Sequence, residues 1–199
     1  MRVAEVSRKT GETDVTISLD LDGPGKSAVS TGCGFLDHML ELFAKHGNFG
    51  LAVSAEGDVR VDFHHLAEDV GIVLGQAFRE ALGEGRGIAR YGSAMLPMDE
   101  ALLLVALDIS GRAWLEYSVS IAAPKVGDFD TELAREFMLA FSRALPLTLH
   151  IRQLSGSNAH HIIEAMFKGL ARAMRQAVSA GAGGAGAAGE LPSTKGLLL

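Results

Sequence analysis

The chain of 199 residues has a single cysteine, Cys33, and no long apolar run. One thiol excludes a disulfide within the chain and fits a reducing compartment, so we expect a cytoplasmic protein. The most apolar stretch, 101–107, ends at Asp108 and is far too short to span a bilayer, and residues 1–10 lack the apolar core of a signal peptide. A net charge of −6 argues against nucleic-acid and anionic-lipid partners.

Internal repetition is the main feature that the sequence does contain. Two alternating, strand-like runs, 14–21 and 101–109, both end as Leu-Asp-apolar-x-Gly, at an offset of 88 residues. His64-His65-Leu-Ala-Glu68 returns as His160-His161-Ile-Ile-Glu164 at an offset of 96, and each copy leads into a helical pattern. Further helices are predicted before them, over 35–45 and 131–143. The chain therefore consists of two copies of one unit, 1–92 and 93–180.

The repeat predicts the fold class. We expect one compact α+β domain with two sheets, four-stranded or similar, each carrying helices on one face, and with the helices of the two halves packed between the sheets. Residues 181–199 form the rest of the chain, in which the Gly/Ala-rich stretch 179–189 predicts a flexible linker. The tail ELPSTKGLLL (190–199) either frays or becomes ordered over a site.

The two HHxxE motifs predict metal binding. On a helix Glu68 shares a face with His64 or His65, but both rings cannot readily bind the same ion as that glutamate. Two ions with ligands from both halves would let every histidine and glutamate of the two motifs bind a metal. The alternative is that each motif is a hydrogen-bonded, structural polar cluster at a helix end. Two copies in equivalent places favour metal.

The preceding helix of each half supplies a further ligand. His38 stands before the first motif, and alignment of the halves places Glu136 opposite it. Nitrogen and oxygen ligands without thiolate suit Mn²⁺, with Fe²⁺ or Zn²⁺ as alternatives. The predicted metal ligands are His38, His64, His65, Glu68, Glu136, His160, His161 and Glu164.

Other polar residues are less specific. His46 and His150 fit either a structural role or one near the substrate. Basic residues close to the motifs (Arg90, Arg112, Lys168 and Lys195) are each typical of a solvated surface, but together they can bind a phosphate. The residues alone indicate a dinuclear metal enzyme that acts on a small phosphorylated substrate.

Five segments resemble the imidazoleglycerol-phosphate dehydratase family of histidine biosynthesis: FLDHML (35–40), DFHHLAEDVGIVLG (62–75), RYGSAMLPMDEAL (90–102), the HHIIE region (148–177) and PSTKG (192–196). The resemblance covers essentially the whole chain in order, apart from the Gly/Ala-rich stretch. It implies a hydro-lyase that converts D-erythro-imidazoleglycerol phosphate to imidazole acetol phosphate.

The resemblance also implies a homo-oligomer of twenty-four subunits, with two Mn²⁺ in each active site and the sites at subunit interfaces. The metal ligands it implies are the eight given above, although many relatives carry histidine where this chain has Glu136. It implies a glutamate, Glu12, in contact with the substrate. The phosphate contacts it implies are Arg90, Arg112, Lys168, Ser193 and Lys195.

The expected chemistry follows from the substrate. The proton to be lost lies on carbon with no adjacent carbonyl, so a simple base faces a very poor acid. Metal ions favour imidazolate, which expels the hydroxyl to give a diazafulvene-like intermediate with an acidic C–H. We expect Glu12 to carry the proton, with His46 or a metal-bound water as alternatives. The rival interpretations are a dinuclear phosphate-ester hydrolase and a non-catalytic metal-binding assembly.

Overall fold

The computed structural model describes residues 1–180 and 189–199, and its two halves repeat one order of elements. The first half contains β1 (Val3–Lys9), β2 (Thr13–Asp20), β3 (Ser27–Ser30), α1 (Gly34–Gly47), β4 (Gly50–Gly57) and α2 (His64–Leu82). The second contains β5 (Tyr91–Met98), β6 (Ala101–Asp108), β7 (Trp114–Ser118), α3 (Leu133–Ala144), β10 (Thr148–Ser155) and α4 (Ala159–Val178). A small hairpin, β8 (Lys125–Val126) and β9 (Phe129–Asp130), is inserted before α3.

The two four-stranded sheets share one topology. Their strand orders are β1-β2-β4-β3 and β5-β6-β10-β7, which are the same order once the halves are aligned. The first hairpins also share one register, since Val3 pairs with Asp20 and Tyr91 with Asp108, an offset of 88 residues at both positions. The internal duplication predicted from the sequence is therefore present in three dimensions.

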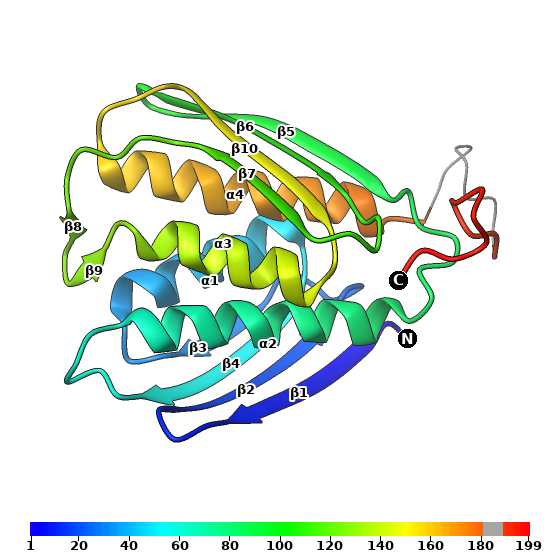
Figure 1. Ribbon diagram of the computed structural model, residues 1–199, viewed down its shortest axis with the longest axis horizontal. Coiled ribbons are helices and arrows are strands. Elements are labelled where there is room, and N and C mark those ends of the chain that lie inside the picture. The colour runs from blue at the N-terminus through cyan, green and yellow to red at the C-terminus, as the bar shows by residue number, and fades with distance from the viewer. Residues whose placement is uncertain (181–188) are drawn as a thin grey trace.

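The helices lie between the sheets, as Figure 1 shows, with one sheet on each outer side. Alternate residues of β2 and β6 are buried against them, because successive strand side chains point to opposite faces. Within the helical layer α2 packs on α3, and α1 packs on α4. The predicted α+β class, with helices packed between two sheets, is confirmed, and α1 and α4 carry residues of both halves to one place.

Glycines set the closest approach of the helices. A Cβ on Gly71 would lie 2.8 Å from the Phe137 carbonyl oxygen, and one on Gly75 would lie 2.7 Å from the Ala144 Cβ. Because both glycines are on the face of α2 that meets α3, the two backbones approach more closely than larger residues permit.

The bounds predicted for two strands (14–21 and 101–109) and two helices (35–45 and 131–143) agree with the structure to within two residues at each end. The sequence pattern gave no bounds for the other elements and did not locate β1, β3, β5, β7 or the β8–β9 hairpin. The predicted flexible linker falls mostly on residues 181–188, outside the described residues. No helix in the described part of the chain has the length and apolar character needed to cross a membrane.

Candidate functional site

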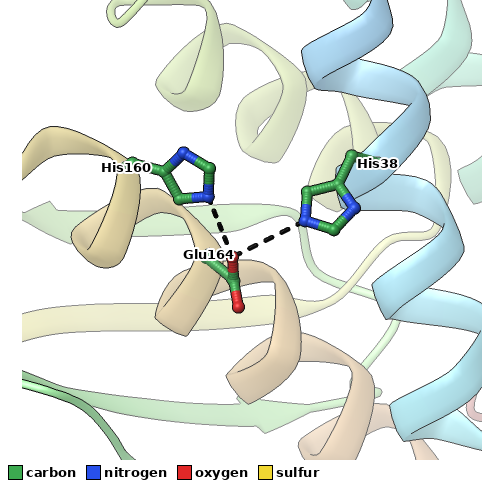
Figure 2. A group of neighbouring side chains, drawn as sticks. All are labelled: His38, His160 and Glu164. Atoms are coloured by element: carbon green, nitrogen blue, oxygen red, sulfur yellow. Dashed lines mark hydrogen bonds and ion pairs between the residues drawn. The ribbon is translucent and has the colours of Figure 1, made fainter.

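His38, His160 and Glu164 form the first cluster, which joins the two halves (Figure 2). His160 and Glu164 lie one turn apart on α4, with Nε2 and Oε2 separated by 3.0 Å. His38 projects from α1, and its Nε2 lies 3.7 Å from the same oxygen. One ligand atom from each residue falls within 4.8 Å of the others. The packing of α1 on α4 thus creates a two-nitrogen, one-carboxylate site.

The Glu164 carboxylate is buried, yet it is held in its ionised form. Burial alone raises the pKa of this carboxyl, but hydrogen bonds from Lys168 and His160, with their charges, bring the pKa below its ordinary value. An ionised carboxylate beside two imidazoles suits a divalent ion of the Mn²⁺, Fe²⁺ or Zn²⁺ group. This donor set therefore fits the metal that the sequence predicts.

A second cluster contains His65, Asp58 and Glu12. His65 lies in the first turn of α2, and its Nδ1 lies 3.0 Å from Asp58 Oδ2 and 3.7 Å from Glu12 Oε2. The hydrogen bond to Asp58, with the charge of Glu12, raises the pKa of His65 despite the opposing effect of desolvation.

Buried Asp69 anchors the turn that carries Glu12. Its carboxylate accepts a hydrogen bond from Arg8 at 3.0 Å and another from the Thr13 hydroxyl. Arg8 is on β1 and Thr13 begins β2, so Asp69 fixes both strands of the hairpin to α2. Glu12 is held near His65 in this way.

His161 makes a similar pair with the β5–β6 turn. Its Nδ1 lies 2.7 Å from Glu100 Oε2, and its Nε2 lies 3.6 Å from Asp99 Oδ2. The hydrogen bond from His161, followed by those from the backbone N–H groups of Asn158 and Ser157, lowers the pKa of Glu100 to about 2. The same bond to Glu100 raises the pKa of His161.

Four predicted ligands belong to neither cluster: His161, which pairs with Glu100, and His64, Glu68 and Glu136. The backbone N–H of His64 donates to the Asp62 side chain at 2.7 Å, and Glu136 on α3 accepts from Arg135 at 3.0 Å. The α2–α3 interface therefore does not repeat, among the described residues, the cluster formed by α1 and α4.

The predicted phosphate contacts fall in two places. Arg90, Arg112 and the C-terminal tail meet around Asp108. Arg90 donates to Asp108 and also, through Nη1, to the Pro192 carbonyl at 2.7 Å, while Nη2 of Arg112 lies 3.8 Å from Asp108.

The tail is packed on the body of the chain. Buried Leu198 lies against Gly85 and Gly111, which places Ser193 and Lys195 on a segment next to Arg90. Within the tail the Lys195 backbone N–H donates to the Ser193 hydroxyl at 3.3 Å, and the Ser193 backbone N–H donates to the Leu191 carbonyl at 2.7 Å. The tail therefore lies beside Arg90, at one of the two places where the predicted phosphate contacts fall.

Lys168 lies instead beside the first cluster, bonded to Glu164. With Arg172 and His46 it lines a groove between α1, α4 and β5. Burial, followed by the charges of Lys168 and Arg172, lowers the pKa of His46. His150 is exposed on β10, opposite Glu116 of β7.

Sequence reasoning missed Asp58, Asp99, Glu100 and Asp108, which hold predicted site residues. A signal existed for Glu100, because the offset of 88 residues aligns it with Glu12. Asp58 follows β4 in an irregular segment where the halves do not align, so no repeat signal marks it.

Comparisons with known proteins show similarity over most or all of the chain. Residues 31–174 match the family model described as imidazoleglycerol-phosphate dehydratase. An imidazoleglycerol-phosphate dehydratase of Xanthobacter autotrophicus is 58% identical over 198 residues, covering 100% of this chain and 99% of the relative. One from Acetivibrio thermocellus is 58% identical over 176 residues, covering 88% and 90%.

Two solved structures of imidazoleglycerol-phosphate dehydratases are also similar to this chain in fold. The crystal structure from Staphylococcus aureus has a TM-score of 0.82 at 41% identity, covering 90% of this chain and 99% of that one. The structure from Pyrococcus furiosus, in complex with (S)-C348, has a TM-score of 0.82 at 40% identity, covering 97% and 100%.

Proposed function

Since the chain belongs to the imidazoleglycerol-phosphate dehydratase family, hydro-lyases of histidine biosynthesis, we propose that it dehydrates D-erythro-imidazoleglycerol phosphate with two Mn²⁺ in each active site. The observation that carries this proposal is the His38–His160–Glu164 cluster, where two imidazoles and an ionised carboxylate lie within 4.8 Å of one another. A divalent cation bound there favours the deprotonated form of the substrate's imidazole ring.

The metal set we propose comprises the cluster and the remaining histidines and glutamates of the two motifs and of α3. Nitrogen and oxygen donors dominate it, which suits Mn²⁺. The full set is His38, His64, His65, Glu68, Glu136, His160, His161 and Glu164.

The protein's own residues position the substrate and move its proton. In this proposal Glu12 takes the proton at the reacting carbon, since its carboxylate is 57% exposed and lies next to His65. Arg90 and Arg112, with Ser193 and Lys195 of the tail, hold the phosphate, and Lys168 approaches it from α4. Binding energy from the phosphate then fixes the ring at the metal site.

We further propose an assembly of many copies, twenty-four as the family resemblance implies, with active sites where subunits meet. Its support is that His64, Glu68 and Glu136 join neither cluster within one chain, which leaves them available to complete sites with residues of a second copy. The cytoplasm is the proposed location, in keeping with the single, buried Cys33 thiol.

Turnover of imidazoleglycerol phosphate by chelator-stripped protein, before and after addition of Mn²⁺, tests this function. We expect no product from stripped protein and full recovery with Mn²⁺. Protein that binds two metal ions per chain and still forms no product contradicts the proposal. Glu12→Gln and His46→Gln then separate the proton carriers: we expect turnover to be lost in the first and kept in the second.

A further inference from the structure

Glu12 and Glu100 are counterparts in the duplicated chain with different contacts. The offset of 88 residues that relates the two hairpins also relates these glutamates, and each lies in the turn of its hairpin. Each faces the second histidine of an HHxxE motif. Glu100 approaches Nδ1 of His161 to 2.7 Å, whereas Glu12 stays 3.7 Å from Nδ1 of His65.

The two oxygens of the Glu100 carboxylate have different hydrogen-bond partners. Oε1 accepts the backbone N–H groups of Ser157 at 3.1 Å and Asn158 at 2.8 Å, just before α4 begins. Oε2 accepts from Nδ1 of His161. Because an ionised carboxylate only accepts, the proton of this bond belongs to Nδ1, and the neutral ring then keeps its lone pair on Nε2.

In the first half the hydrogen bond from Nδ1 of the histidine is accepted by Asp58, which has no counterpart in the second half. Asp58 places its two oxygens 3.0 and 3.3 Å from Nδ1 of His65. Glu12 therefore makes no hydrogen bond to His65, whereas its counterpart Glu100 accepts one from His161. In the duplicated chain Asp58 and Glu100 each hydrogen-bond to a histidine ring, and Glu12 does not.

We propose that Glu100 is a positioning residue, which fixes the Nδ1–H tautomer of His161 so that Nε2 is available as a metal ligand. Asp58 fixes the tautomer of His65 in the same way. Because Asp58 rather than Glu12 makes this hydrogen bond, the Glu12 carboxylate can face the substrate. The inference rests on the proposed function, in which both histidines are metal ligands. Carboxylates that hold the far nitrogen of a ligating histidine commonly orient it in this way.

The divided oxygens make Glu100→Gln a sharp test. The two backbone N–H groups require the amide oxygen at the Oε1 position, so the amide NH₂ occupies the Oε2 position and donates to Nδ1 of His161. The ring must then carry its proton on Nε2, which is the wrong tautomer for a ligand at that nitrogen. An acid-to-amide change beside a catalytic histidine acts in the same way in serine proteases.

Asp58→Asn is the matched control. Among residues 1–180 and 189–199, the Asp58 side chain hydrogen-bonds to His65 alone, so the new amide can rotate and keep its oxygen towards Nδ1–H. Asp99→Asn is a second control, because Asp99 is 73% exposed and 3.6 Å from Nε2 of His161. We expect neither to change the tautomer of the nearby ring.

Long-range ¹H–¹⁵N spectra of the histidine rings in metal-free protein, at a pH where the rings are neutral, read the tautomers directly. His65→Gln and His161→Gln assign the signals. We expect Nδ1–H for both rings in the wild type, Nε2–H for His161 alone in Glu100→Gln, and a mixture for His161 in Glu100→Ala, which serves if the glutamine variant does not fold.

Mn²⁺ titration of the same proteins gives the second readout. We expect Glu100→Gln to bind Mn²⁺ about 10–100-fold more weakly at the affected site. Retention of Nδ1–H in Glu100→Gln, or wild-type Mn²⁺ affinity, overturns the inference. Turnover by the wild type decides the proposed function separately, since the tautomers are read without metal or substrate.

Discussion

The guanidinium of Arg90 donates two hydrogen bonds to Asp108, from Nε at 2.6 Å and from Nη2 at 3.1 Å. The same carboxylate lies 3.8 Å from Nη2 of Arg112, so one acid orients both arginines of the proposed phosphate site. Arg90 has a left-handed backbone, with φ at 72°, a conformation that costs about 1–3 kcal/mol in a non-glycine residue. The surrounding bonds hold it there.

Asp108→Asn is therefore expected to impair phosphate binding without removing an arginine. The amide cannot accept both donors of Arg90 and loses the attraction for Arg112. A hydrogen bond to a charged group contributes about 1.5–3 kcal/mol, so kcat/KM falls about 10–100-fold in steady-state kinetics. Asp22→Asn is the control, because Asp22 forms an ion pair with Arg2, which the offset of 88 residues aligns with Arg90. Equal losses in both variants contradict a specific role for Asp108.

Glu164→Gln is expected to remove most of the metal from the first cluster. The neutral amide gives a cation no charge, and it leaves Lys168 without its partner. We expect Mn²⁺ affinity at this site to fall by at least about 100-fold, as measured by competition with a chelating dye. His150→Gln, an exposed change on β10, should keep the wild-type metal content. Normal Mn²⁺ content in Glu164→Gln means that the cluster is not a metal site.

Gly75→Ala is expected to destabilise the helical layer. The new Cβ would lie 2.7 Å from the Ala144 Cβ, 2.8 Å from the Phe141 carbonyl oxygen and 2.9 Å from the Leu145 nitrogen. Two of these atoms are backbone, so α2 and α3 must separate, at a cost of about 1–3 kcal/mol in the free energy of unfolding.

The midpoint of urea denaturation of metal-free protein measures this change. Gly34→Ala provides the comparison, because a Cβ at the start of α1 meets nothing within 4 Å. It should leave the midpoint unchanged or raise it. If Gly75→Ala is as stable as Gly34→Ala, the close approach of α2 and α3 does not depend on glycine.

The fold could be predicted largely from repetition, because two copies of one pattern constrain each other. The alternation in β2 and β6 and the two HHxxE motifs were sufficient for the layers and the order of the halves. The short edge strands β3 and β7 could not be predicted in this way. Their residues make few buried contacts, and their strand state depends on β4 and β10 beside them.

The site was only partly accessible from the sequence. Helical spacing pairs His160 with Glu164, and the helix before the first motif supplies His38, but the distance between α1 and α4 is a property of the folded chain. Asp58 lies seven residues before His65 in an irregular segment, and no periodicity relates them. Among the acids that contact these rings and guanidinium groups, Glu100 had a sequence signal in its offset of 88 residues from Glu12. The others were missed because tertiary contacts bring them to the site.

His46 is expected to make the protein less stable as the pH falls. It lies near the end of α1, where burial, followed by the charges of Lys168, Arg172 and Lys45, lowers its pKa from 6.5, while Glu164 opposes them. The unfolded chain therefore takes up the proton first. The stabilising contribution is complete above pH 6.5 and is lost as the pH falls from there through the lowered pKa of the folded protein.

His46→Gln removes this titration, so the difference in unfolding free energy between about pH 8 and about pH 5.5 should be smaller in the variant than in the wild type. Urea denaturation of metal-free protein at the two pH values measures it, with His150→Gln as the control for loss of an exposed histidine. The control should keep the wild-type pH dependence. If His46→Gln keeps it as well, burial does not disfavour the protonated ring, and His46 is then accessible enough to exchange protons in the groove beside Lys168.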